Sequence, residues 1–123
     1  LDNVFARHAR IAEGVRKAVA AWEMPLYAQS PDLYSNSVSA IKTPDGFDAN
    51  EIVTLASEKY DTAFGAGLGQ VSGKLFRIGH LGSLPDVLAL AGIATAEMCM
   101  KDLGFDITLG AGVAAAQEHY RTT

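Results

Sequence analysis

One stretch of the chain combines a basic residue in an apolar strand pattern with a dense group of glycines. It runs from Gly65 to Gly82, GAGLGQVSGKLFRIGHLG, and its apolar core 75–78 (LFRI) carries Arg77. A guanidinium within a strand usually meets an anion, and its planar shape suits bidentate binding of a carboxylate or phosphate. Glycines on both sides let another molecule approach the backbone closely. We therefore predict a binding element with Arg77 as its principal residue; the alternative is a structural salt bridge to a carboxylate of the chain.

Two residues that follow Arg77 are further candidates for the same site. Gly79 and His80 continue the strand pattern inside the glycine-rich stretch. His80 could line the site, and the alternative is that it only packs in a turn. His80 and the other two histidines, His8 and His119, are not spaced as metal ligands, so the sequence predicts no metal site.

Other motifs in the chain resemble cofactor or catalytic motifs only superficially. The segment 69–74, GQVSGK, is one residue too short for a phosphate loop, and Leu75 stands where Ser or Thr should be. The segment 110–115, GAGVAA, lacks the βαβ unit of a dinucleotide site and is predicted to begin a helix. The single cysteine, Cys99, has no nearby histidine. No lysine has the apolar or cationic surroundings expected of a Schiff-base lysine; they are Lys17, Lys42, Lys59, Lys74 and Lys101.

Length and composition indicate one globular domain, residues 1–123. Apolar residues make up 49% of the chain and charged residues 20%. The net charge of −4 argues against nucleic acid or an acidic membrane as the main partner, and no apolar run is long enough to span a membrane. A lone cysteine fits a reducing, cytoplasmic compartment.

Because the chain opens with Leu1 directly in a helical pattern, we expect it to be processed or part of something longer. The basic group near the start is predicted to be a solvated helix face: Arg7, Arg10, Arg16 and Lys17.

Hydrophobic periodicity and capping residues predict the elements that position Arg77. Asp48 is expected to cap the second helix, and Gly14 indicates close packing of the first. The third helix is apolar nearly all round and is expected to be the buried spine. The predicted helices span 2–22, 48–60, 83–104 and 112–120, and the predicted extended segments 26–29, 37–42, 75–78 and 107–109. This order favours an α+β domain: a small, mostly antiparallel sheet with helices packed on one face.

Three segments resemble a known family. The segments 1–8 (LDNVFARH), 65–69 (GAGLG) and 73–82 (GKLFRIGHLG) are similar to the C-terminal domain of serine–glyoxylate aminotransferases. These are class V enzymes of fold type I that use pyridoxal phosphate, and the resemblance covers almost the whole chain in order. It implies the fold of that small C-terminal domain, which closes over the substrate. It also implies that Arg77 binds the α-carboxylate of an amino-acid or keto-acid substrate.

The resemblance further implies that this chain is one part of an enzyme. The lysine that carries pyridoxal phosphate, and the residues that hold the cofactor, would lie in a large domain outside the chain. The catalytic residues would therefore lie there too, and residues 1–22 would connect the two domains. The parent would be a homodimer that transfers an amino group to glyoxylate from serine, alanine or aspartate. The alternatives are a stand-alone module that binds a small carboxylate without catalysis, and a structural interaction domain.

Overall fold

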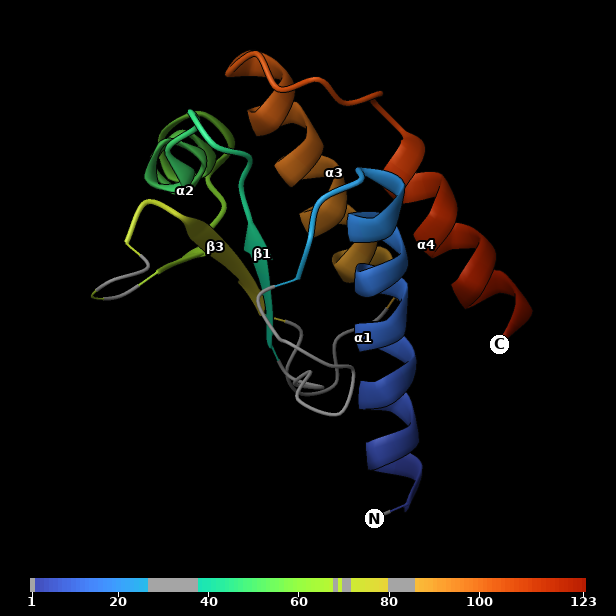
Figure 1. The fold of residues 1–123 in the computed structure, drawn as a ribbon. Coiled ribbons are helices and arrows are strands. Elements are labelled where there is room, and N and C mark those ends of the chain that lie inside the picture. The colour runs from blue at the N-terminus through green and yellow to red at the C-terminus, as the bar shows by residue number, and fades with distance from the viewer. Residues whose placement is uncertain (1, 27–37, 68, 70–71, 80–85) are drawn as a thin grey trace.

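A computed structural model describes the chain except for residues 1, 27–37, 68, 70–71 and 80–85 (Figure 1). The described residues form a small antiparallel sheet with helices packed against it, which confirms the predicted α+β class. In this part of the chain, no helix is both long and apolar enough to cross a membrane. The elements are α1 (Asp2–Ala21), β1 (Val38–Lys42), α2 (Ala49–Tyr60), β2 (Gly65–Ala66), β3 (Leu75–Gly79), α3 (Asp86–Asp102) and α4 (Ala111–Thr122).

The strand that carries Arg77 lies in the middle of the sheet. The strand order is β1-β3-β2, and both pairings are antiparallel. Phe76 lies opposite Ile41 and is fully buried with it. Because successive strand residues point to opposite faces, Arg77 lies on the face away from Phe76. Of the predicted strand 26–29, Leu26 forms an isolated bridge with Ile41, and the other three residues lie outside the described part.

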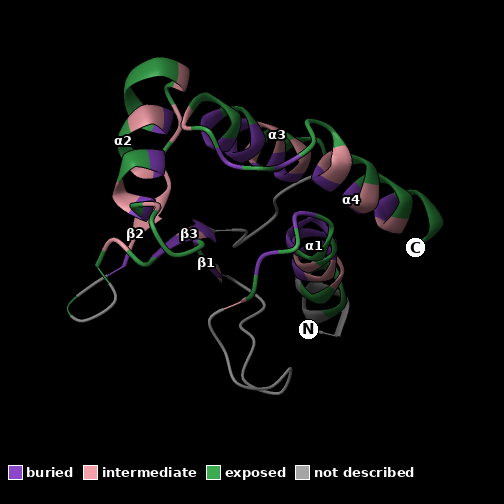
Figure 2. Ribbon diagram, turned by 45° about the horizontal axis from the view of Figure 1, so that its top comes forward, coloured by how far each residue is buried: buried purple, intermediate pink, exposed green. Residues whose placement is uncertain are grey.

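Helices α1 and α2 each bury one face, as their apolar spacing predicts. Figure 1 shows α1 and α4 side by side, and Figure 2 shows the buried parts of α1 and α3 turned towards the interior. Gly14 lets α1 and α4 approach, because a Cβ there would overlap the ring of Tyr120. The close packing expected at Gly14 is therefore confirmed. Asp48 also caps α2 as predicted, accepting a hydrogen bond from the backbone N–H of Asn50 at 2.9 Å.

One expectation about the second half of the chain was wrong. Helix α3 is not buried all round, because Val87 and Leu88 are 72% and 56% exposed. One side of α3 packs against the other helices and the opposite side is exposed. Because both sides are rich in apolar residues, the sequence did not indicate which side is exposed. The segment 107–109, predicted as a short extended piece, forms no regular element, and the backbone N–H of Ala111 donates to the carbonyl of Thr108 and closes a turn before α4.

A buried carboxylate joins three helices. Glu97 of α3 is only 2% exposed and accepts a hydrogen bond from the indole Nε1–H of Trp22 at 2.9 Å. It also accepts from the backbone N–H groups of Gly110 at 3.1 Å and Gly112 at 2.8 Å. These N–H groups belong to the start of α4, where the helix dipole favours a negative charge. Glu97 thus connects the end of α1 and the start of α4 to α3.

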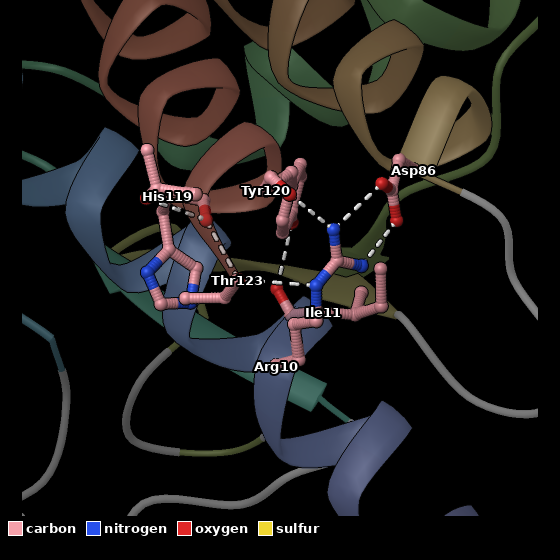
Figure 3. A network of polar contacts seen from close by, with 7 residues as sticks. Arg10, Ile11, Asp86, His119, Tyr120 and Thr123 are labelled. Carbon is pink, nitrogen blue, oxygen red and sulfur yellow. Dashed lines mark hydrogen bonds and ion pairs between the residues drawn. The ribbon is translucent and has the colours of Figure 1, made fainter.

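A second polar cluster fixes the start of α3 (Figure 3). Arg10 of α1 forms a bidentate ion pair with Asp86, with N–O distances of 2.6 and 2.9 Å. Its guanidinium also donates to the carbonyl of Tyr120 and to the hydroxyl of Thr123. The Tyr120 hydroxyl donates to the carbonyl of Ile11, and burial raises the pKa of this hydroxyl to about 12. The predicted solvated face is therefore wrong for Arg10, whereas Arg7 and Lys17 are exposed as expected.

The substitution Glu97→Gln is expected to destabilise the fold by about 2 kcal/mol. The glutamine amide keeps one acceptor oxygen, but its NH₂ group would face N–H donors, and hydrogen bonds to a charged group contribute about 1.5–3 kcal/mol. Chemical denaturation of both proteins measures the difference. Glu58→Gln, at an exposed position of α2, is the matched control and should leave stability nearly unchanged. Equal unfolding midpoints for Glu97→Gln and wild type would contradict the structural role of the carboxylate.

Stability should also depend on the charge of Asp86. The hydrogen bond from Arg10 lowers the pKa of Asp86 below its ordinary value, so the folded state favours the ionised carboxylate. This contribution is fully present above the unfolded-state pKa of about 3.9 and is lost as the pH falls through the lower folded-state pKa. Asp86→Asn should therefore destabilise the protein near neutral pH, with a difference that shrinks below about pH 4. Unfolding curves across this range measure the difference, with the exposed Asp45→Asn as control. A difference that stays constant with pH would exclude this linkage.

Candidate functional site

Arg77 lies at the centre of the sheet with a small residue on each side. In the strand register it stands opposite Ala40 of β1 and Gly65 of β2. Neither neighbour has a side chain long enough to cover the guanidinium. Arg77 is half-buried, and its Nε atom is buried without a hydrogen-bond partner. Among the described residues, the Nε–H of this cation is therefore shielded from water and has no acceptor.

The alternative of a structural salt bridge finds no support in the described part of the chain. There, Arg77 forms no ion pair. Several carboxylates are already engaged elsewhere: Asp86 with Arg10, Asp102 with Lys59, and Glu97 with the donors at the start of α4. A buried donor without a partner carries an energetic cost of about 1–3 kcal/mol. An anion from outside the described residues would remove that cost.

The structure describes one of the other two predicted site residues and leaves the role of both a prediction. Gly79 is the last residue of β3 and pairs with Val38. It lies two positions from Arg77, so strand alternation places it on the same face. His80 lies outside the described residues, and its role stays a prediction.

None of the lysines has the surroundings expected of a Schiff-base lysine. All five lysines are exposed, whereas a Schiff-base lysine needs desolvation or a neighbouring cation. Lys59 is instead paired with Asp102 at 2.8 Å, and the hydrogen bonds to Asp102 and Tyr60 raise its pKa. The chain supplies no lysine that fits the cofactor's chemistry.

The thiol of the single cysteine is not placed for nucleophilic chemistry. Cys99 is fully buried, and burial raises the pKa of its thiol to about 11, so it is not a thiolate near neutral pH. The described residues include no group of histidine, cysteine and carboxylate side chains placed to hold a metal ion. Arg77 therefore remains the principal candidate, and what it can do chemically is to bind and orient an anion.

Sequence reasoning did not single out Gly65, which lies directly against the Arg77 side chain. A Cβ built at Gly65 would be 3.0 Å from Nε and 3.2 Å from Nη2 of Arg77. The many glycines indicated this region as a binding element, but they did not indicate which glycine lies against the Arg77 side chain. Only the strand register, which sets Gly65 opposite Arg77, makes that distinction.

Comparison with known proteins places the chain in a family, although no family model matches it. It is 71% identical over 123 residues to the L-aspartate–glyoxylate aminotransferase of Paracoccus denitrificans. It is 52% identical over 120 residues to the serine–glyoxylate aminotransferase of Hyphomicrobium methylovorum. A solved structure, the pyridoxamine–pyruvate aminotransferase from Mesorhizobium loti, matches 98% of the chain with a TM-score of 0.91 and 32% identity.

In each comparison the chain is matched almost entirely while the relative is matched only in part. The alignments with the Paracoccus enzyme, the Hyphomicrobium enzyme and the Mesorhizobium structure cover 100%, 98% and 98% of this chain. They cover only 31%, 30% and 31% of those three proteins, respectively. The chain thus spans about a third of the length of these proteins. Sequence and fold agree that the chain is homologous to about a third of the serine–glyoxylate and aspartate–glyoxylate aminotransferases and of their structural relative.

Proposed function

We propose that this chain is the C-terminal, substrate-closing domain of an aminotransferase that uses pyridoxal phosphate, and that Arg77 binds the α-carboxylate of the substrate. The observation that carries the proposal is the Arg77 guanidinium, held between Ala40 and Gly65 with a buried Nε that has no partner. A carboxylate offers two oxygens that match two parallel N–H donors of a guanidinium. The family resemblance of the segment 73–82 supports the same role.

In this proposal Arg77 contributes by positioning. A bidentate contact fixes both the place and the orientation of the α-carboxylate, which also fixes the atoms attached to the α-carbon. Holding a reactant in the right geometry can supply a large part of a rate enhancement, because the loss of rotational and translational freedom occurs on binding. The cofactor chemistry would belong to the rest of the parent protein, since every lysine of this chain is exposed.

The proposed substrates share the group that Arg77 would recognise. Glyoxylate is the proposed acceptor, and serine, alanine or aspartate the donor; all carry a carboxylate next to the reacting carbon. The relative that is 71% identical is an L-aspartate–glyoxylate aminotransferase, which favours aspartate for this chain. An anchor for the shared carboxylate does not distinguish these donors, so donor preference would depend on contacts made outside this chain.

The proposed partners are the parent's own large domain and a second copy of the parent. Figure 1 shows the N-terminal end of α1 extending beyond the sheet and the other helices, which supports a role for residues 1–22 as the connection between the two domains. A homodimer with sites near the subunit interface and a cytoplasmic location complete the proposal.

In the full-length parent, Arg77→Ala should reduce kcat/KM for both the amino acid and the keto acid. The loss corresponds to about 2–5 kcal/mol of transition-state stabilisation. The reason is that a charged contact to the α-carboxylate is lost in both half-reactions. Steady-state kinetics with each substrate measure the effect. Binding of pyridoxal phosphate, followed by its absorbance, should be unchanged.

Lys74→Ala is the matched control for this experiment. Lys74 is an exposed cation that directly precedes β3, so its removal changes the net charge by the same amount without touching the proposed contact. It should leave the kinetics near wild type. Wild-type kinetics for Arg77→Ala would overturn the assignment of Arg77, and a parent without aminotransferase activity would favour a non-catalytic carboxylate-binding module.

A further inference from the structure

We propose that Gly65 is a positioning residue for Arg77: its missing side chain leaves the space that the arginine side chain occupies. This inference rests on the proposed function of Arg77. It concerns how the fold holds the guanidinium ready for a carboxylate. Gly65 itself touches no reacting atom.

The distances between the two residues show how closely the arginine lies over the glycine. A Cβ added at Gly65 would be 3.0 Å from Nε, 3.2 Å from Cβ and 3.2 Å from Nη2 of Arg77. All three approaches are tighter than most contacts that a Cβ makes, so the arginine would have to shift by a few tenths of an ångström to admit one. The Arg77 side chain therefore runs across Gly65 from its first carbon to its guanidinium.

The backbone does not explain why position 65 is a glycine. Gly69 and Gly73 in the same stretch have φ angles of +59° and +78°, which favour glycine whatever surrounds them. Gly65 is a strand residue outside the set of positive-φ glycines, so its backbone suits any residue. What an alanine would change at position 65 is the space beside Arg77.

The neighbouring strands leave the arginine as the group that has to move. Gly65 and Arg77 are fixed opposite each other by the β2–β3 pairing, and β3 is also paired with β1 on its other side. A methyl group at position 65 would stand against Nε and Nη2, the two nitrogens of one edge of the guanidinium. Either the guanidinium shifts or that edge is blocked, and both outcomes weaken a bidentate contact with a carboxylate.

A double-mutant cycle in the full-length parent tests this inference. The four proteins are wild type, Gly65→Ala, Arg77→Ala and the double variant, each assayed for KM and kcat with the amino acid and the keto acid. Gly65→Ala should raise KM for both substrates by about tenfold or more, while pyridoxal phosphate still binds. In the Arg77→Ala background the same glycine substitution should have no further effect, because residues that act through one contact are not additive.

Gly92→Ala is the matched control. Gly92 lies in α3, and a Cβ there would meet nothing within 4 Å, so the substitution adds the same methyl group without a clash. It should leave KM and kcat unchanged. Chemical denaturation of all five proteins shows whether any variant has lost its fold.

The outcomes separate this inference from the function on which it rests. If Arg77→Ala has wild-type kinetics, the proposed function fails. If Arg77→Ala is impaired but Gly65→Ala behaves like wild type, the positioning role of Gly65 is overturned and the role of Arg77 stands. If Gly65→Ala lowers activity by the same factor in both backgrounds, Gly65 acts on the structure independently of Arg77, which also overturns the inference.

Discussion

The burial of the Glu97 carboxylate is the constraint on which the helical part of this domain depends. Removing a carboxylate from water costs several kcal/mol unless donors replace the lost hydration. Here the donors are the Trp22 indole and the backbone at the start of α4, so satisfying the charge fixes where α1 ends and where α4 begins. The sheet packs against these helices, and β3 therefore has a defined support on its buried side.

Arg77 also has a buried polar atom, but unlike the Glu97 carboxylate this atom has no hydrogen-bond partner among the described residues. Glu97 accepts three hydrogen bonds from its own chain, whereas the buried Nε–H of Arg77 donates to no acceptor among the described residues. Buried polar atoms without partners are rare in native proteins, and each one calls for an explanation. The proposed explanation is that the missing acceptor is the carboxylate of the substrate. The charge that stabilises the fold and the charge assigned to function are then different residues on different elements.

The parts of this structure that could be predicted from sequence depend on local signals. The apolar spacing of α1, the cap of α2 at Asp48 and a cation inside an apolar strand are all visible within a few residues. The parts that were missed depend on residues far apart in the chain. Arg10 and Asp86 are 76 positions apart, and Glu97 was hidden in a helix that looked uniformly apolar. The space beside Arg77 likewise follows only from strand register, which joins positions 65 and 77.

If Arg77 binds a carboxylate as proposed, a chain whose lysines are all exposed would fit a division of labour within a larger enzyme. The relatives in this comparison are named for aspartate, serine and pyridoxamine as amino donors, yet each contains a region similar to nearly the whole chain. Aspartate, serine, glyoxylate and pyruvate share a carboxylate beside the reacting carbon that a guanidinium can hold, whereas pyridoxamine has none, so there the anchor would serve the keto acid alone. Because the proposed anchor contacts only the carboxylate, a similar domain can serve enzymes that use different amino donors. The contacts that tell the donors apart are then expected in the remaining two thirds of the protein.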